Sequence, residues 1–412
     1  MLIGGSVMTS RIGVMFMQSQ SFFGADSELH AQLLRYMDRT YVSPHVALTL
    51  DNNNSVETSA KRQFEKIPDL SVRPTNFGIS RSNSLSFSSR VCSMAQTALE
   101  ITKLAAYIRA NNIRIIHGTE KPRDAFYGTL LAKLTGARSV VHMHVSYGDW
   151  LAREVKWALH QADAIIAVSP FSAKSIVDAN YPSDRVHTVL NALDLDSQHW
   201  EVGSAVRETR RDLGVPDDTV VFGVVSRLFL YKGHRDLLEA FASVKEQMPN
   251  YRLVIVGEDD PRSHPGGGSF TAELKDLAAN LAISENIIFT GFRSDIPKLM
   301  ESFDVYAMPS WEEPFGMVYL EAMAMRKPVV AWCLAGPKEI IIDDETGYLV
   351  TPKAIKDLGN VLLKLARDGG LRKRLGHAGR RRVEQQFSSQ RMCCDVLAIY
   401  QKLVGSAKDR RG

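Results

Sequence analysis

Short apolar runs rich in Val and Ile alternate along the chain with longer segments whose apolar residues recur at helical period. This alternation is typical of βαβ units around a mostly parallel sheet. The stretch 51–89 is richer in Ser and Asn and has no clear period. In the first half the pattern predicts strands near 11–17, 45–50, 113–117, 139–145, 164–168 and 187–190, and helices over 27–37, 91–110, 124–134 and 150–160.

The second half restarts the same alternation. It predicts strands over 220–226, 253–256, 287–290, 305–308 and 329–332, and helices over 234–247, 271–281, 296–301, 315–325 and 354–366. The polar segment 194–216 lacks strand alternation and is the expected linker.

Two alternating blocks predict an α/β fold with two Rossmann-like domains. We place the first over residues 1–195 and the second over 196–390, followed by a C-terminal helix within 391–412 that can pack back on the first domain. Open sheets of this kind bind ligands outside the carboxyl ends of their strands. The chemistry is therefore expected between the two halves.

Composition narrows the class of protein. Of 412 residues, 45% are hydrophobic and 23% are charged, which excludes disordered, collagen-like and disulfide-scaffold chains. The formal net charge of +4 does not indicate a nucleic-acid binder. Four cysteines, dispersed apart from the adjacent pair Cys393 and Cys394, fit a reducing, cytoplasmic compartment.

No transmembrane helix is expected, because no apolar run approaches the ~20 residues that a span needs. The apolar piece 12–17 leads into polar residues without a cleavage site, so we interpret it as the first strand and not as a signal peptide. Met8 is an alternative start to Met1.

The most informative stretch is 309–324, which reads P-S-W-E-E-P-F-G-M-V-Y-L-E-A-M-A. Pro314 suits a first helical residue, and Gly316 lets a ligand approach the backbone closely. The N–H groups at that helix end suit a phosphate or a sugar hydroxyl.

Glu313 and Glu321 are eight residues apart in this stretch, which is roughly 12 Å along a helix axis. That separation suits one extended ligand held at two ends better than a catalytic carboxylate pair, which works at about 5–9.5 Å. The alternative is that Glu313 only caps the helix and Glu321 forms a surface salt bridge.

Two further loops follow predicted strands. Arg227 and Lys232 lie five residues apart and can converge on one diphosphate, although a solvated basic loop would look the same. Gly24, in the loop after the first strand, permits close approach to phosphate oxygens. The sequence there is not G-x-G-x-x-G, so a nicotinamide cofactor gains little support.

His142 and His144 end a strand of the first half, and strand alternation places both on one face. Their spacing could suggest a metal, but no third or fourth ligand is visible in the sequence, so we expect no metal site. His144 is better interpreted as a group that hydrogen-bonds or polarises a ligand, and His142 as a core histidine.

Together these segments resemble the retaining glycosyltransferases of family 4, which have the GT-B fold of two Rossmann-like domains facing a deep cleft. The resemblance covers nearly the whole chain, and its most specific part is the E-x7-E motif from Glu313 to Glu321. Supporting segments are 289–292, 328–331, 336–340 and 347–350. The chain departs from the family where many members have Gly, at Ala25, Ala192, Ser226 and Arg326.

The resemblance implies a site for a nucleotide-diphosphate sugar. Arg227 and Lys232 would hold the diphosphate, Glu321 the ribose, and His144 would contact the sugar at the reacting centre. Glu313 would hold the sugar with neighbouring backbone N–H groups. The other implied donor-binding residues are Gly24, Ala25, Gly291, Phe292, Arg293, Phe315, Gly316, Met317 and Val318.

The implied reaction moves a sugar, in the manner of a hexosyltransferase, to an acceptor hydroxyl with retained anomeric configuration, in the synthesis of a glycan, a glycolipid or a glycosylated metabolite. It needs no cofactor and no divalent metal. The acceptor, a saccharide, lipid or small molecule, would bind the first domain. The alternatives are a sugar-nucleotide epimerase, a phosphorylase, or a nucleotide-sugar-binding protein without activity.

A basic cluster near the C-terminus comprises Arg372, Lys373, Arg374, Arg380, Arg381 and Arg382. We interpret it as a solvated helical face, which could touch an anionic membrane surface if the acceptor is a lipid.

Overall fold

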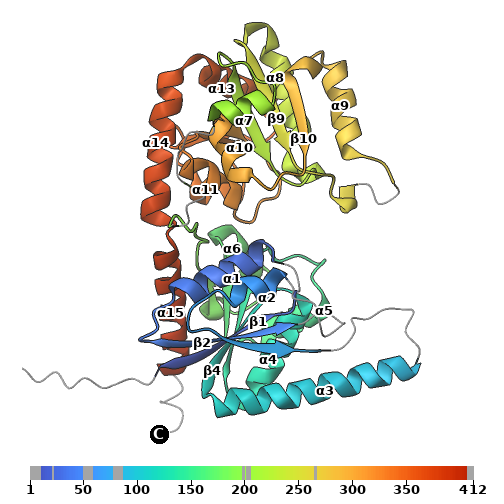
Figure 1. Ribbon diagram of the computed structural model, residues 1–412, viewed down its shortest axis with the longest axis vertical. Coiled ribbons are helices and arrows are strands. Elements are labelled where there is room, and N and C mark those ends of the chain that lie inside the picture. Colours follow the sequence, from blue (N-terminus) through green and yellow to red (C-terminus); the bar gives the residue numbers. More distant parts are fainter. Residues whose placement is uncertain are drawn as a thin grey trace, which may run out of the picture. The chain divides into compact units, whose positions relative to one another are not determined.

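The computed structural model describes residues 11–20, 23–49, 59–77, 87–196, 200, 206–263 and 267–405. The chain forms two units, one of residues 1–191 with 389–412 and the other of residues 192–388 (Figure 1). The expected limits were 195 and 390. The alternative start at Met8 and residues 51–58 lie outside the described ranges.

The first unit is built on a parallel sheet whose described strands run in the order β3-β2-β1-β4-β5-β6-β7. These strands are β1 (Ile12–Gln18), β2 (Val42–Thr49), β3 (Ser71–Thr75), β4 (Ile113–Thr119), β5 (Arg138–Met143), β6 (Ala164–Ala167) and β7 (Val186–Thr188). Every residue of β1 is buried, as expected where helices cover both faces of a parallel sheet.

The helices of this unit connect its strands, and one returns from the end of the chain. They are α1 (Ala25–Tyr36), α2 (Ser59–Phe64), α3 (Phe87–Ala110), α4 (Pro122–Thr135), α5 (Arg153–Gln161), α6 (Pro170–Asp178) and α15 (Ser389–Gly405). Helix α15 packs against α1, where the Cys393 thiol lies 3.7 Å from the carbonyl oxygen of Leu33.

The second unit repeats the architecture with strand order β10-β9-β8-β11-β12-β13. Its strands are β8 (Val220–Val225), β9 (Tyr251–Val256), β10 (Ile287–Gly291), β11 (Val305–Ala307), β12 (Val329–Trp332) and β13 (Gly347–Val350). Its helices are α7 (Val206–Asp212), α8 (His234–Val244), α9 (Phe270–Asn280), α10 (Ile296–Ser302), α11 (Met317–Ala324), α12 (Pro337–Ile340), α13 (Ile355–Arg367) and α14 (Gly369–Gln386).

Both sheets are doubly wound, which confirms the prediction of two Rossmann-like domains. In each sheet the strand order reverses beside the first strand, between β1 and β4 and between β8 and β11. Ligands of such sheets bind at the carboxyl ends of the strands at this switch point. The loops that follow β1, β4, β8 and β11 are therefore the places to look for chemistry.

Some predictions of local structure were wrong. The expected linker contains α7, a short helix whose charged sequence hides any apolar period. Pro314 does not begin a helix: α11 starts at Met317, and its N-cap is Gly316. Helix α6 went unpredicted although its start is legible, because Ser169 caps it and Pro170 follows directly.

The basic cluster was also misinterpreted. It lies on α14, but four of its five arginines bind backbone carbonyls: Arg372 those of Leu365 and Ala366, Arg374 that of Asp344, Arg380 those of Trp200 and Ala324, and Arg382 those of Glu339 and Ile340. Of the six members, Lys373, Arg374 and Arg381 are exposed. In the described part of the chain, no helix is both long and apolar enough to cross a membrane.

Candidate functional site

In the second unit, the loop after β8 packs closely against the loop after β11 and is hydrogen-bonded to it. Gly233 has a φ of +74°, and a Cβ atom there would lie 1.9 Å from the carbonyl oxygen of Pro309. The carbonyl oxygen of Tyr231 accepts hydrogen bonds from the Trp311 amide at 2.7 Å and the Ser310 hydroxyl at 3.0 Å. The two loops that the sequence singled out are thus one rigid assembly.

Lys232 and Glu313 face each other across this assembly. Lys232 Nζ lies 2.6 Å from Glu313 Oε2, and their side chains are 21% and 13% exposed. A charge-assisted bond in such partly dry surroundings is strong. The structure therefore pairs two residues for which the family resemblance implied separate roles, one for the diphosphate and one for the sugar.

The start of α11 leaves backbone donors beside this pair. Gly316 has a φ of +106°, a conformation that favours glycine, and a Cβ atom there would lie 2.5 Å from the Tyr319 ring. Met317 and Val318 are the first residues of α11, so their N–H groups have no acceptor within the helix. These donors and the positive end of the helix dipole can receive an anion or a hydroxyl.

Glu321 lies on α11 one turn further into the helix, at the residue the sequence predicted for the ribose. Burial raises the pKa of its carboxyl group to about 7. No hydrogen-bond or ion-pair partner of this carboxyl group is found within the described ranges. Because Glu313 precedes the helix, the helical rise does not set its separation from Glu321, and that part of the spacing argument was wrong.

Arg227 is held by a buried carboxylate. Its Nη1 lies 2.6 Å from Asp260 Oδ2, while its side chain is 69% exposed. Arg262 donates two further bonds of 2.8 Å to Asp260, and these bonds, followed by the charges of both arginines, hold the Asp260 pKa well below its usual range. Asp260 was not expected from the sequence, because it is thirty-three residues away in another loop.

The segment expected to face the nucleobase follows β10. Gly291 ends the strand with a φ of +70°, and the Phe292 side chain is 70% exposed. Arg293 forms a two-point ion pair with Asp295, at 2.8 and 2.6 Å. An exposed aromatic ring beside a fixed guanidinium group offers stacking surface for a base.

The first unit places the remaining predicted residues at its own switch point. Gly24 is the N-cap of α1, and Ala25 is the first helical residue. Asp26 binds Lys121 at 2.9 Å, Lys121 binds Glu120 at 3.1 Å, and Glu120 accepts the His144 amide at 3.2 Å. This ion-pair chain connects the start of α1 to the end of β5, where His144 lies.

His144 belongs to a cluster of four histidines that the sequence did not reveal. His30 of α1, His117 of β4 and His142 of β5 have zero exposure, and one nitrogen of each lies within 4.8 Å of one nitrogen of the others. No third ligand was visible in the sequence, but the fold brings three imidazole rings together, and imidazole suits several metals. One nitrogen pair, His117 Nε2 and His142 Nδ1, already shares a hydrogen bond of 3.2 Å.

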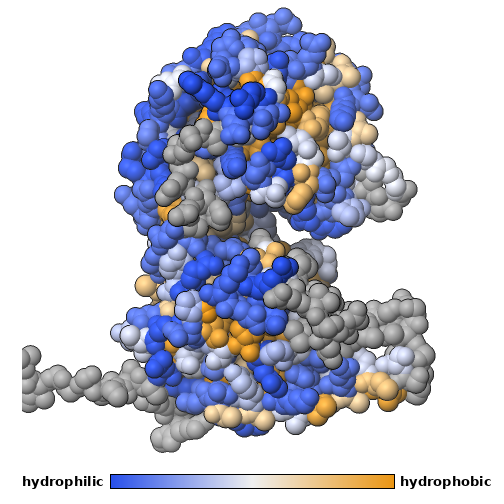
Figure 2. All heavy atoms as spheres, in the orientation of Figure 1, coloured by the Kyte–Doolittle hydropathy of each residue, from blue (hydrophilic) through white to orange (hydrophobic). Residues whose placement is uncertain are grey.

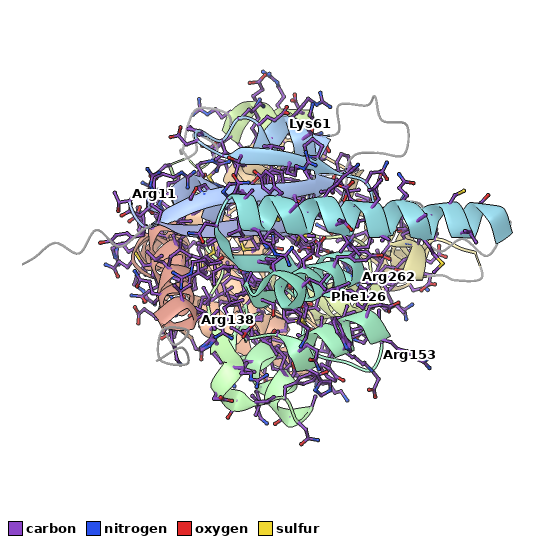
Figure 3. All side chains as sticks on the ribbon, turned by 90° about the horizontal axis from the view of Figure 1, so that it is seen from below. Arg11, Lys61, Phe126, Arg138, Arg153 and Arg262 are labelled. Atoms are coloured by element: carbon purple, nitrogen blue, oxygen red, sulfur yellow. The ribbon has the colours of Figure 1, made fainter. Side chains whose placement is uncertain are left out.

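A groove in the first unit separates α3 from α4. Its volume is about 630 Å³, and its walls include Phe77, Met94, Ile101, Phe126 and Tyr127. Helix α3 extends past α4 (Figures 1 and 3). Hydrophobic residues lie along its projecting part (Figure 2). Val91, Met94 and Leu99 are 50%, 73% and 55% exposed.

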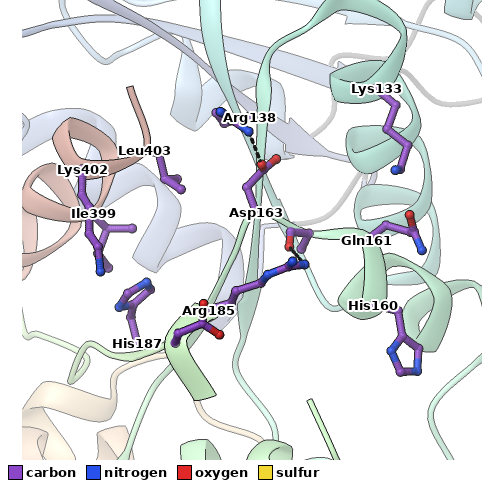
Figure 4. A pocket seen from close by; sticks show the side chains of 12 residues that line it. Lys133, Arg138, His160, Gln161, Asp163, Arg185, His187, Ile399, Lys402 and Leu403 are labelled. Atoms are coloured by element: carbon purple, nitrogen blue, oxygen red, sulfur yellow. Dashed lines mark hydrogen bonds and ion pairs between the residues drawn. The ribbon is translucent and has the colours of Figure 1, made fainter. Parts of the chain in front are cut away.

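Another pocket lies at the opposite, amino edge of the first sheet (Figure 4). It has a volume of about 550 Å³ and is lined by Arg138, Arg185 and Lys402 among others. Arg138 pairs with Asp163 at 2.7 Å, and Arg185 donates to the carbonyl oxygen of Ala162 at the end of α5. Cations at helix C-termini stabilise the helices. This role explains the position of Arg185 without any ligand in the pocket.

Two family models match the chain. The model for glycosyl transferases group 1 matches residues 205–382, and the model for glycosyltransferase family 4 matches residues 59–197. Together they span the second unit and much of the first.

Individual relatives agree with these models. The chain is 31% identical over 316 residues to spore coat protein SA of Bacillus subtilis, covering 73% of this chain and 81% of that one. It is 31% identical over 258 residues to D-inositol 3-phosphate glycosyltransferase of Stackebrandtia nassauensis, covering 61% and 56%. The first curated relatives are matched over only 55 to 63% of their length.

Among solved structures, Anabaena HepE in complex with UDP superimposes with a TM-score of 0.75 at 22% identity. The match covers 95% of this chain and all of that one. At this identity the likeness shows the fold, GT-B, and nothing more.

Proposed function

The chain belongs to the group 1, family 4 glycosyltransferases, and we propose that it moves a sugar from a nucleotide-diphosphate sugar to an acceptor hydroxyl with retained anomeric configuration. The observation that carries the proposal is the Lys232–Glu313 pair beside the start of α11. A cation, a carboxylate and free backbone N–H groups meet there, as a diphosphate-linked sugar requires.

In the proposed reaction the bond between the anomeric carbon and the diphosphate oxygen breaks, and a bond from that carbon to the acceptor oxygen forms. The transition state places positive charge on the sugar and negative charge on the leaving phosphate. Arg227, Lys232 and the first N–H groups of α11 stabilise the latter, where fixed dipoles and charges contribute most to catalysis. The departing phosphate oxygen takes the acceptor proton on the same face, so no enzymic nucleophile is assigned.

Arg227, Lys232 and the first N–H groups of α11 would meet the charge of a leaving diphosphate, so we propose a reaction without an obligatory divalent metal. Glu321 would bind the ribose, and Gly291, Phe292 and Arg293 would border the base. From the first unit, His144 would reach the sugar, and the start of α1 at Gly24 and Ala25 would approach the phosphates.

The acceptor is proposed to bind the first unit. The groove between α3 and α4 supports an acceptor with an apolar portion, because pockets of this size with apolar walls commonly hold small ligands.

The test compares Glu313→Gln and Lys232→Ala with the unchanged protein in donor hydrolysis and in transfer, after a thermal-shift panel of nucleotide diphosphates and nucleotide sugars has identified the donor. Both variants should lose transfer by at least tenfold. Unchanged rates in two folded variants would falsify the proposal. Donor consumption without any acceptor would instead indicate an epimerase, and donor binding without turnover an inactive binding protein.

A further inference from the structure

The histidine cluster of the first unit is connected to the last helix of the chain. The Tyr400 hydroxyl, on α15, lies 2.5 Å from His117 Nδ1, and His117 Nε2 lies 3.2 Å from His142 Nδ1. Tyr400 is fully buried and lies 283 residues after His117. A side chain from the end of the sequence thus reaches the switch point of the first sheet through two imidazole rings.

The direction of this hydrogen-bond chain follows from Tyr400. Among the described residues, His117 is the only partner of its hydroxyl group. A phenol O–H is a stronger hydrogen-bond donor than an imidazole N–H, and an imidazole nitrogen is a stronger acceptor than a phenol oxygen. Tyr400 therefore donates to His117 Nδ1, which leaves the proton of neutral His117 on Nε2.

The same reasoning extends to the next ring. His117 Nε2–H donates to His142 Nδ1, so the proton of neutral His142 lies on Nε2, which has no hydrogen-bond partner among the described residues. Burial, together with the neighbouring histidines, lowers the pKa values of His117 and His142 well below 6.5. Both rings are therefore neutral, as the assigned tautomers require. The tautomer of His142 is set by a tyrosine on another element.

His144 rests directly on His142. Their ring centroids are 4.3 Å apart with an interplanar angle of 30°, and the His30 ring meets His144 at 5.9 Å and 62°. Neither ring nitrogen of His144 has a hydrogen-bond partner among the described residues, so stacking and the Glu120 bond to its amide hold the residue. The orientation and charge distribution of His142 therefore define the surface on which His144 lies.

We propose that Tyr400 and His117 are positioning residues, which fix the tautomer and orientation of His142 and thereby the placement of His144. The predicted effect on catalysis rests on the proposed function, whereas the tautomer assignment does not. It makes helix α15 a part of the reacting centre, although its Tyr400 is fully buried and would not touch substrate.

The experiment removes one oxygen atom, with Tyr400→Phe in the full chain. Long-range proton–nitrogen spectra of histidine-labelled protein should show the His117 and His142 nitrogens moving toward mixed tautomers, and His144 shifting with them. The turnover number for transfer should fall two- to tenfold, the factor expected for one hydrogen bond, while the donor KM stays within twofold. The matched control is Tyr181→Phe, which removes a buried hydroxyl 3.4 Å from the Lys156 carbonyl in the same unit and should change neither readout.

A second pair of variants keeps the test decisive if Tyr400→Phe does not fold. His117→Gln places a donor near the position of Nε2 and should preserve the His142 spectrum, whereas His117→Asn places its amide near Nδ1 and should disturb it. Unmoved His142 and His144 signals in Tyr400→Phe or His117→Asn would overturn the inference. A histidine spectrum of the unchanged protein that responds to a chelator would also overturn it, because the nitrogens would then be metal ligands.

The spectra separate this inference from the proposed function. If no donor supports transfer, the proposed function fails, and the nitrogen shifts still decide whether Tyr400 controls His142 and His144.

Discussion

The Lys232 ammonium group lies 2.6 Å from a carboxylate oxygen of Glu313, so the cation expected to hold the donor diphosphate is neutralised by the carboxylate expected to hold the donor sugar. An incoming diphosphate must share Lys232 with Glu313. A sugar hydroxyl that binds Glu313 would weaken the hold of that carboxylate on Lys232. The pair thus couples recognition of the two halves of a nucleotide sugar.

This coupling predicts opposite effects of two substitutions on a nucleotide diphosphate without its sugar. Glu313→Gln should bind it about three- to tenfold more tightly, because Lys232 loses its competing anion. Lys232→Gln should bind it at least tenfold more weakly, since a hydrogen bond to a charged group contributes ~1.5–3 kcal/mol. Calorimetric titration with uridine and guanosine diphosphates measures both.

Lys364→Gln is the control for the loss of a cation from the second unit, because its ammonium lies beside Tyr348 and Asp344 and away from the two loops. It should leave nucleotide affinity unchanged. Weaker binding by Glu313→Gln would contradict the competition between carboxylate and diphosphate.

The sequence predicted the two Rossmann-like domains because buried parallel strands consist of short, continuous runs of apolar residues. It placed β1, β4, β9 and β12 to within a few residues for that reason. It missed β13, whose sequence Gly347-Tyr348-Leu349-Val350 offers an apolar run of only three residues. The start of α11 was misplaced because Pro314 suits a first helical turn, while the left-handed Gly316 that caps the helix is recognisable only from its backbone.

Within the candidate site, the sequence indicated individual residues but not their partners. Arg227, Lys232, Glu313 and Glu321 stand in loops or helices that local patterns mark. The ion pairs of Arg227 with Asp260 and of Lys232 with Glu313 join loops that are far apart in sequence. No local pattern encodes such contacts. The histidine cluster draws on α1, β4 and the end of β5, so the sequence indicated His142 and His144 but not their contacts with His30 and His117.

Glu321 should make the stability of the protein depend on pH. Its folded-state pKa of about 7 lies above the ordinary 4.5, so the folded state holds the proton more tightly and stability falls as pH rises from 4.5 to 7. The loss amounts to roughly 3 kcal/mol at most. Glu321→Gln cannot ionise, so its stability relative to the unchanged protein should rise by that order between pH 5 and pH 8 in urea unfolding. An equal difference in unfolding free energy between the two proteins at both pH values would contradict a raised pKa of Glu321.

The histidine cluster should have the opposite effect in acid. Burial, followed by the charge of His144, lowers the pKa of His30 to about 3, so the unfolded chain takes up a proton from pH 6.5 downward while the folded chain does not. Stability is therefore lost as pH falls below 6.5. His30→Gln removes this titration, and its stability relative to the unchanged protein should improve by about 2 kcal/mol between pH 7.5 and pH 5. The exposed His377 supplies the control, since His377→Gln should give a difference that does not change with pH.

Arg326 occupies a backbone conformation that suits glycine. Its φ is +56°, its side chain is exposed, and no side-chain hydrogen bond or ion pair of Arg326 is found among the described residues. A residue with a Cβ atom pays about 1–2 kcal/mol to enter this region, whereas glycine enters it freely and loses about 0.5–1 kcal/mol through its more flexible unfolded state. Arg326→Gly should therefore raise the free energy of unfolding by about 0.5–1 kcal/mol, which urea unfolding can measure.

The matched substitution Arg381→Gly tests whether the conformation is the cause. Arg381 is also an exposed arginine, but it lies inside helix α14, where glycine is unfavourable by about 1 kcal/mol. The two variants remove the same side chain and the same charge. Opposite signs of the change in unfolding free energy would therefore isolate the effect of the backbone conformation. Destabilisation by Arg326→Gly would show that the arginine contributes contacts worth more than the strain, and that the departure from the family's glycine is favourable in this chain.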